Sequence, residues 1–159
     1  MATSLSLYVH IPWCVKKCPY CDFSSHALSA DGELDPDLAE TYVNQLITDL
    51  HADLEDFGLS RRIHSIFIGG GTPSLLPVRS LDRLFKAINA VAPIEADAEI
   101  TLEANPNSAD QSRLRGYRQA GVNRLSLGVQ SFDDRSLTHL GRLHDSAEAK
   151  RAIDAARAA

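Results

Sequence analysis

Apolar and polar positions follow two periods along this chain of 159 residues. Short segments with an apolar residue at every second position predict strands, and longer segments with apolar residues three or four positions apart predict helices. The predicted strands are Leu5–Ile11, Ile63–Ile68, Glu99–Glu103 and Val122–Val129. The predicted helices are Asp35–Phe57, Leu81–Val91, a third that the capping box Ser108-x-x-Gln111 opens and Gly121 ends, a short one between Asp133 and Gly141, and a last one from Asp145 to Ala159.

Strand and helix therefore alternate along the whole chain. Repeated βα units are typical of an α/β fold with a parallel sheet. Their right-handed crossovers place the carboxyl ends of all strands at one edge of that sheet. Because βα folds carry their functional sites at this edge, the residues that directly follow the strands are the first candidates for a site.

Most of the predicted strands carry polar side chains on one face. These are the side chains of Tyr8 and His10, of Glu99, Thr101 and Glu103, and of Arg124, Ser126 and Gln130. Parallel strands that are covered on both faces usually read as continuous apolar segments. We therefore expect this face to line a lumen that holds water and a polar ligand. The alternative is that these groups satisfy one another in an ordinary core, for example Arg124 with Glu103.

The only cysteines of the chain, Cys14, Cys18 and Cys21, follow the first predicted strand with the spacing C-x-x-x-C-x-x-C. Three thiolates on one loop suit three irons of a [4Fe-4S] cluster, which normally takes four cysteines. The fourth iron then keeps an open position, as catalytic metal sites do. A disulfide framework is less favoured because it requires an even number of cysteines. A zinc site requires a fourth ligand, for which His10 and His26 are the candidates.

Two further motifs follow the second and third strands. The segment Gly69-Gly-Gly-Thr-Pro-Ser74 lets the backbone approach a ligand closely, because its glycines have no side chains. It is not a P-loop, since no Gly-Lys-Ser/Thr follows, and alone it predicts a turn or an anion-binding nest. Glu103 ends the third strand on its polar face, where it can accept hydrogen bonds from a hydroxyl or ammonium group or pair with Arg124.

Composition excludes several classes of partner. The net charge of −5 does not favour nucleic-acid or membrane-surface binding, which needs clustered Lys and Arg. No apolar segment approaches the roughly 20 residues that a transmembrane helix needs, and the first residues lack the basic region of a signal peptide. Three crowded, unpaired cysteines favour a reducing compartment, so we expect a cytoplasmic protein.

Together these motifs resemble the radical S-adenosylmethionine (radical SAM) superfamily. Within it they are similar to the oxygen-independent coproporphyrinogen III oxidases and to the related HemW haem chaperones. The motifs that carry the resemblance are Tyr-Val-His-Ile-Pro-Trp-Cys14, Gly-Gly-Gly-Thr-Pro-Ser-Leu-Leu76, Glu-Ala-Asn-Pro106, Asn-Arg-Leu-Ser-Leu-Gly-Val-Gln-Ser-Phe132 and Leu-Gly-Arg142. The resemblance implies a partial (β/α) barrel, of which about four β/α units are present here. Residues 1–159 are then expected to be the N-terminal part of the core domain, with the rest of the barrel and a C-terminal domain absent from this chain.

The resemblance also implies roles for individual residues. The cluster ligands are Cys14, Cys18 and Cys21. The positions that line the S-adenosylmethionine site are Tyr8, Tyr20, Gly70 and Glu103. The positions that contact a second S-adenosylmethionine in the oxidases are Gly71, Thr72, Gln130 and Arg142.

One departure separates the two branches of this family. The oxidases carry another cysteine two residues after the third ligand, where this chain has Phe23. The Cys21-Asp22-Phe23 form looks like the HemW branch, whose haem-contacting His motif lies in a later region. We therefore expect a haem chaperone with haem or porphyrin, haem-accepting enzymes and an electron donor as partners. The alternatives are a coproporphyrinogen III oxidase and a zinc- or iron–sulfur-stabilised binding domain without radical chemistry.

Overall fold

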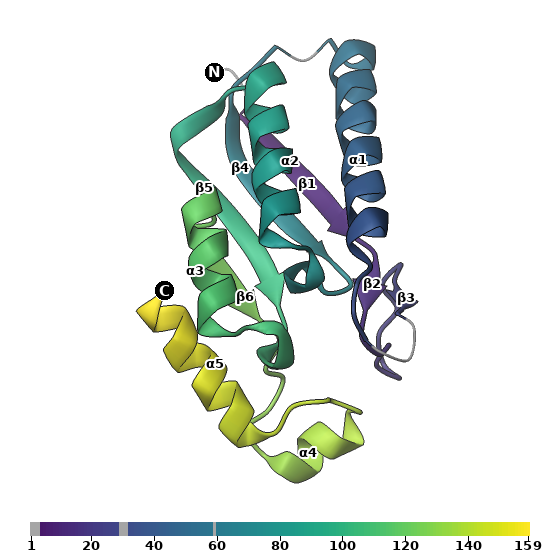
Figure 1. Cartoon of the computed structure of the whole chain (residues 1–159), viewed down its shortest axis with the longest axis vertical. Helices are drawn as coiled ribbons and strands as arrows, with labels where there is room; N and C mark the ends of the chain where they lie inside the picture. The colour runs from purple at the N-terminus through teal and green to yellow at the C-terminus, as the bar shows by residue number, and fades with distance from the viewer. Residues whose placement is uncertain (1–3, 29–31, 59) are drawn as a thin grey trace.

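The computed structural model describes residues 4–28, 32–58 and 60–159 (Figure 1). Its main sheet is parallel, with the strand order β1-β4-β5-β6. These strands are β1 (Leu5–Ile11), β4 (Ile63–Gly70), β5 (Ile94–Ala104) and β6 (Arg124–Leu127). The helices are α1 (Pro36–Asp56), α2 (Val78–Val91), α3 (Gln111–Ala120), α4 (Asp134–His139) and α5 (Ser146–Ala158). The predicted α/β class and parallel sheet are confirmed.

Three short elements sit at the carboxyl ends of the strands. A two-stranded parallel ribbon of β2 (Trp13–Cys14) and β3 (His26–Ala27) brackets the loop that carries the cysteines. Two 3₁₀ turns, η1 (Pro73–Leu75) and η2 (Pro106–Ser108), follow β4 and β5. These elements, together with α4, gather at the lower end of the sheet (Figure 1).

Helices α1, α2 and α3 cover one face of the sheet (Figure 1). The core lies between these layers, and its largest fully buried side chains include Ile11, Ile66, Ile68, Leu81, Leu84, Ile88, Leu102 and Tyr117. The helix ends follow from local chemistry. The Asp35 carboxylate accepts hydrogen bonds from the first N–H groups of α1, which satisfies donors that have no partner within the helix.

The opposite face of the sheet has no helix packed on it among the residues that the structure describes. It carries the polar and aromatic side chains of the predicted alternation, and Tyr8 is 56% exposed there. Arg124 lies on this face and donates to Glu99 at 3.1 Å and to Thr101 at 3.3 Å. The alternative pairing of Arg124 with Glu103 is therefore wrong, and Glu103 keeps its carboxylate for other partners.

Several predicted boundaries differ from the structure. Ser108 does not open the third helix, because Ser108 lies in η2 and Asp110 accepts the hydrogen bond from the Arg113 N–H instead. The second helix begins earlier than predicted, at Val78, directly after Pro77. The third strand is longer than predicted. The fourth strand is shorter, because its backbone turns after Leu127 and Gln130 adopts a φ of 68°.

Candidate functional site

A cavity of about 270 Å³ lies where the strands end, near the lower size limit of small-molecule sites. The segments around it are the cysteine loop, the glycine turn after β4, the end of β5, the loop after β6 and the connection between α4 and α5. All of the predicted site residues except Tyr8 line it: Cys14, Cys18, Tyr20, Cys21, Gly70, Gly71, Thr72, Glu103, Gln130 and Arg142. The topology thus gathers residues that lie far apart in the sequence.

The cysteine loop is anchored by backbone hydrogen bonds at both ends. The N–H of His26 donates to Pro12 at 2.7 Å, and the N–H of Leu28 donates to Cys14 at 2.8 Å. Cys14 is buried, Cys18 and Cys21 are half-buried, and all are free thiols. Among residues 4–28, 32–58 and 60–159, no group of three His, Cys, Asp or Glu side chains is close enough to hold a single metal ion.

His10 orients this loop and does not serve as a free ligand. Its Nε2 lies 2.7 Å from the Ser24 carbonyl oxygen, and its Nδ1 lies 2.9 Å from the Tyr8 hydroxyl. Because a carbonyl only accepts, Nε2 carries the proton and Nδ1 accepts from Tyr8. Both ring nitrogens of this zinc-ligand candidate therefore have protein partners. The other candidate, His26, is exposed on β3.

The glycine turn packs its backbone directly against the cysteine loop. The N–H of Gly71 donates to Ile11 at 2.8 Å, and the N–H of Thr72 donates to Trp13 at 2.7 Å. A Cβ added to Gly71 would lie 2.5 Å from the Trp13 carbonyl oxygen and 3.0 Å from the Cys14 sulfur. Gly70 has a φ of +114°, which side chains rarely tolerate. The glycines thus serve protein packing at this edge, a role that the sequence analysis did not foresee.

Glu103 lines the cavity at the end of β5, and Tyr8 lies on β1, exposed on the uncovered face of the sheet. The Glu103 carboxylate accepts a hydrogen bond of 3.3 Å from the Gly70 N–H. Tyr8 does not line the cavity; its ring stacks on Phe67 with centroids 6.3 Å apart. Partial burial, and then the negative charge of Glu103, raise the pKa of Tyr8.

Arg142 links the cysteine loop to the ends of β5 and β6. Its Nη1 donates to the Cys18 sulfur at 3.3 Å and to the Tyr20 hydroxyl at 3.4 Å. Its Nη2 donates to Gly128 at 2.7 Å and to the side chain of Asn105. The remaining Nε is buried and has no hydrogen-bond partner among the described residues. A buried polar atom without a partner is uncommon and calls for an explanation such as an absent ligand.

Asn105 is a site residue that the sequence analysis missed. It accepts from Arg142 and donates from Nδ2 to the Thr72 hydroxyl at 3.0 Å, so it joins two walls of the cavity. The available signal was its position two residues after Glu103, at the point where the strand ends. A Cβ on Gly128 would approach its Oδ1 to 2.8 Å, which accounts for a glycine opposite it.

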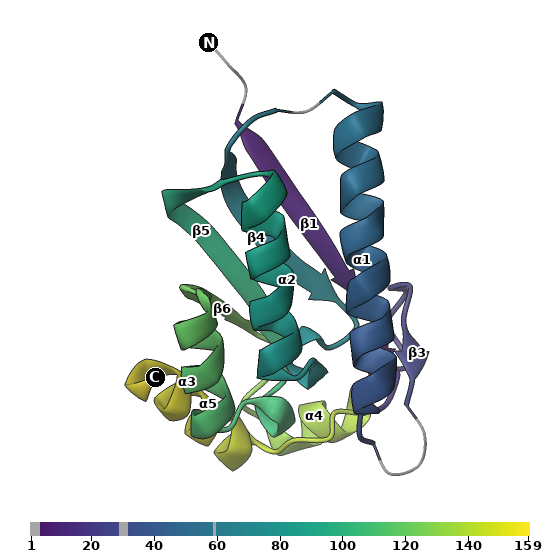
Figure 2. The same cartoon turned by 45° about the horizontal axis from the view of Figure 1, so that its top comes forward.

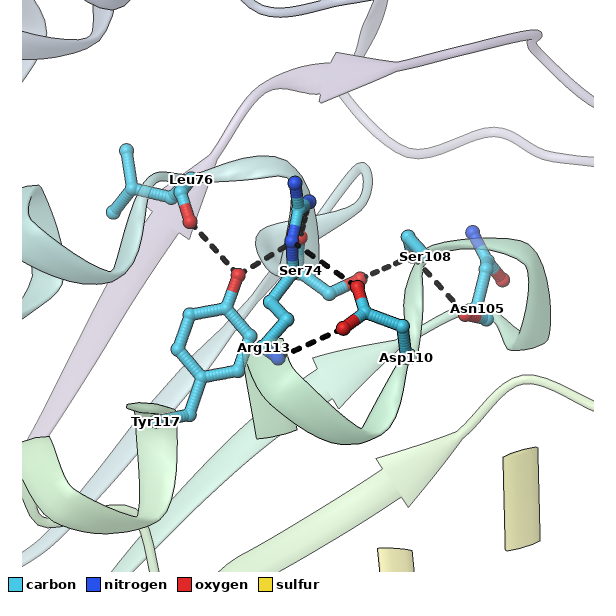
Figure 3. A network of polar contacts seen from close by, with 7 residues as sticks. All are labelled: Ser74, Leu76, Asn105, Ser108, Asp110, Arg113 and Tyr117. Atoms are coloured by element: carbon cyan, nitrogen blue, oxygen red, sulfur yellow. Dashed lines mark hydrogen bonds and ion pairs between the residues drawn. The ribbon is translucent and has the colours of Figure 1, made fainter. Parts of the chain in front are cut away.

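A second polar network supports the glycine turn from the helix side (Figure 3). The Tyr117 hydroxyl lies 2.8 Å from the carbonyl oxygens of both Ser74 and Leu76, which share its single proton. The Ser108 hydroxyl donates to the Asn105 carbonyl at 3.0 Å, so Ser74 is the donor in the hydrogen bond between the Ser74 and Ser108 hydroxyls. This network fixes η1 against η2 and α3, beneath the cavity.

These features agree with the comparison to known families. The family model described as "Radical SAM superfamily" matches residues 8–159, so the chain belongs to the radical SAM superfamily. Within that class it is similar to proteins named "Heme chaperone HemW". Identity is 51% over 156 residues for the Haemophilus influenzae protein, covering 96% of this chain and 39% of that protein. Identity to the Escherichia coli protein is 53% over 148 residues, which covers 93% of this chain and 38% of that protein.

A solved structure shows the same fold. The coproporphyrinogen III oxidase HemN from Escherichia coli, a radical SAM enzyme, superposes with a TM-score of 0.83 at 31% identity, over 98% of this chain and 34% of the oxidase. The resemblance to both branches and the partial-barrel fold class are thereby confirmed. Membership of the superfamily implies a [4Fe-4S] cluster and S-adenosylmethionine as cofactors. The chain spans about two fifths of the length of the HemW relatives, 39% and 38%.

Proposed function

We propose that Cys14, Cys18 and Cys21 hold a [4Fe-4S] cluster at the cavity. The observation that carries this proposal is that all three free thiols line one cavity together with the glycine turn. Each thiolate of such a cluster binds a different iron, so the thiols need not converge on one point. A zinc ion would require them to converge, and the described residues offer no such group of three.

The same cavity is proposed to bind one S-adenosylmethionine. Tyr20, Gly70, Gly71, Thr72, Glu103, Gln130 and Arg142 provide its walls. The positive charge of Arg142, which lines the cavity, suits a carboxylate, and the Glu103 carboxylate suits an ammonium or a ribose hydroxyl. Tyr8 remains a proposed contact from the open face of the sheet. When bound, the cluster and S-adenosylmethionine supply one-electron chemistry, while the protein residues bind, orient and exclude water.

Anaerobic reconstitution tests the cofactor proposal. About one [4Fe-4S] cluster per chain is expected, with iron and acid-labile sulfide in equal amounts. Replacement of any one of Cys14, Cys18 or Cys21 by alanine is expected to abolish the chromophore. Tight zinc without labile sulfide in anaerobic preparations would contradict the proposal and favour the binding-domain alternative.

For the whole protein we propose a haem chaperone in the cytoplasm, with residues 1–159 as the front part of its core domain. The support is the 51% and 53% identity to proteins named for that role. The residue argument is Phe23, which lines the cavity and is 61% exposed at the position where the oxidases carry another cysteine. Haem, haem-accepting enzymes and an electron donor are the proposed partners. The part of the chain that the structure describes has no helix long and apolar enough to cross a bilayer.

The second candidate is an oxygen-independent coproporphyrinogen III oxidase, which the TM-score of 0.83 to HemN favours. The deciding assay uses the intact parent protein with coproporphyrinogen III, S-adenosylmethionine and a reductant under anaerobic conditions. We expect no turnover and a stoichiometric Soret band on haem addition. Multiple-turnover formation of protoporphyrinogen IX would contradict the chaperone proposal and show that the protein is the oxidase.

A further inference from the structure

The connection between α4 and α5 is held firmly at both ends. At the end of α4, Gly141 has a φ of +69°, its N–H donates to Thr138, and the N–H of Arg142 donates to Leu137 at 2.9 Å. This is a Schellman-type helix end. At the start of α5, Asp145 and Glu148 form a capping box. The backbone between these two caps is therefore well fixed.

This connection touches the two loops that close the cavity. On one side Gly141 packs against the cysteine loop, where an added Cβ would lie 3.1 Å from Pro19. On the other side His144 lies 3.0 Å, through Nε2, from the carbonyl oxygen of Val129 in the loop after β6. Helix α4 accordingly lies below the strand ends, between α5 and the β2–β3 segment (Figure 2).

His144 is the buried side chain that ties this connection to the loop after β6. It is 3% exposed, and its Nδ1 has no partner among the described residues. Because a carbonyl only accepts, Nε2 carries the proton and donates to Val129. Burial lowers the pKa of His144, which keeps the ring neutral near pH 7. The histidine therefore acts as a neutral donor of one hydrogen bond.

The acceptor of this hydrogen bond directly precedes a strained residue. Gln130 has a φ of 68°, the only positive φ among the described residues other than glycine. Such a conformation persists where the surrounding structure over-determines it. Two short-range hydrogen bonds contribute, from Val129 N–H to Leu127 at 2.9 Å and from Ser131 N–H to Val129 at 2.8 Å. The Val129 carbonyl thus receives a local donor and a distant one, and the distant one is His144.

We infer that His144 is a positioning residue of the cofactor site. Its hydrogen bond to Val129 holds the next residue, Gln130, at its positive φ. The same bond keeps Arg142, which precedes His144 by two residues, against Cys18 and Gly128. The inference rests on the proposed binding of S-adenosylmethionine at this cavity. It adds a residue that lies outside the cavity lining and acts on the site through the backbone of the loop after β6.

The test compares two variants with a matched control. His144→Phe keeps an aromatic ring, somewhat larger than imidazole, and removes the donor, whereas His144→Gln retains an amide donor close to the position of Nε2. The control is Ser80→Ala, which removes a buried hydroxyl that donates to Glu40 at 2.6 Å between α2 and α1. The first measurement is amide hydrogen exchange in the protein without cofactors. The second is S-adenosylmethionine affinity at matched cluster content.

Residues 128–132 are expected to exchange faster in His144→Phe than in the parent, and near the parent rate in His144→Gln and Ser80→Ala. Affinity for S-adenosylmethionine is expected to fall about tenfold in His144→Phe and less than about threefold in His144→Gln, since tenfold corresponds to about 1.4 kcal/mol. Equal losses in both His144 variants, or unchanged exchange in His144→Phe, would overturn the inference. Failure of the parent to bind S-adenosylmethionine would instead contradict the proposed function, while the exchange measurement still decides the role of His144.

Discussion

Two polar networks meet at the same edge of the sheet and differ in how completely their atoms are paired. Below the glycine turn, Ser74, Ser108 and Tyr117 are buried, and their hydroxyls all have protein partners. Across the cavity, Arg142 donates to several groups of the protein and still retains a buried Nε without a partner. The first network is complete without a ligand, and the second is not.

This difference in pairing indicates that the first network supports the fold and that the second binds a ligand, although both lie at one edge of the sheet. A closed buried network rigidifies the structure that it joins, and here it joins η1, η2 and α3 behind the glycine turn (Figure 3). A buried polar atom without a partner calls for an explanation such as an absent ion or ligand. Substitutions in the first network are therefore expected to change stability, and substitutions in the second to change cofactor affinity.

The largest effect is expected from Tyr117→Phe. The ring would stay buried, but the Leu76 carbonyl would lose its donor, while the Ser74 carbonyl would keep the hydrogen bond of 2.8 Å from Arg113 Nη1. Stability is expected to fall by about 1–3 kcal/mol, the cost of leaving a buried group unsatisfied. Thermal unfolding measures this as roughly 2–4 °C for each kcal/mol in a chain of this size. Unchanged unfolding would mean that water replaces the hydroxyl and that the network is not closed.

The next effect is expected from Glu103→Gln, which keeps an oxygen for the Gly70 N–H and removes the charge. S-adenosylmethionine affinity is expected to fall about tenfold, since hydrogen bonds to charged groups contribute about 1.5–3 kcal/mol. The melting temperature is expected to change little, because Arg124 pairs with Glu99 and not with Glu103. A lower melting temperature with unchanged S-adenosylmethionine affinity would show that Glu103 stabilises the fold and does not bind the cofactor.

A smaller effect is expected from Arg142→Lys. Lysine retains the positive charge but loses the planar fork that reaches Cys18, Asn105 and Gly128 together. Affinity for S-adenosylmethionine is expected to fall several-fold, by about 1 kcal/mol, with little change in unfolding. A matched control is Arg124→Lys, since Arg124 is an exposed partner of Glu99 on the open sheet face. Equal affinity losses in both variants would show a general charge effect instead of a local one.

The sequence predicts the fold and the gathering of the motifs at the strand ends, because both depend on features local in the chain. Alternation of strand and helix fixes the parallel sheet, and the parallel sheet brings the strand ends to one edge. The motif residues Cys14, Gly70 and Glu103 therefore meet at one cavity. Arg142 also lines it, but it follows α4 and was expected there only from the family resemblance.

The pairing between these residues could not be predicted in the same way. The choice of Glu99 over Glu103 as the partner of Arg124 depends on the parallel register, in which Arg124 stands beside Thr101. Asn105 and His144 act through hydrogen bonds to segments distant in sequence, and the bond from Arg142 to Cys18 spans 124 positions. The wrong start predicted for the third helix has a local cause. Ser108 and Asp110 are both good N-cap residues, and Pro106 begins the 3₁₀ turn η2 that contains Ser108.

The last prediction concerns how the stability of the fold depends on pH. The effect is smallest near neutral pH and grows in alkali, where it tests the closed network most specifically. Burial is the main cause that raises the pKa of Tyr117 well above its usual value, and the charges of Arg113 and Asp110 act in opposite directions on it. In the unfolded chain the phenol ionises near pH 10, whereas in the folded chain it keeps its proton at that pH. The folded state then binds more protons than the unfolded state, so stability is expected to fall as the pH rises above about 10.

Denaturant unfolding between pH 8 and pH 11 measures this response, since this range includes the pKa of a free tyrosine phenol, about 10. Other tyrosines also titrate there, so the informative quantity is the difference between the parent and Tyr117→Phe. The stability advantage of the parent over Tyr117→Phe is expected to be constant up to about pH 9 and to shrink above pH 10. A difference that stays constant through pH 11 would show that the Tyr117 hydroxyl is accessible to water in the folded state, and the contrast between a closed and an open network would be lost.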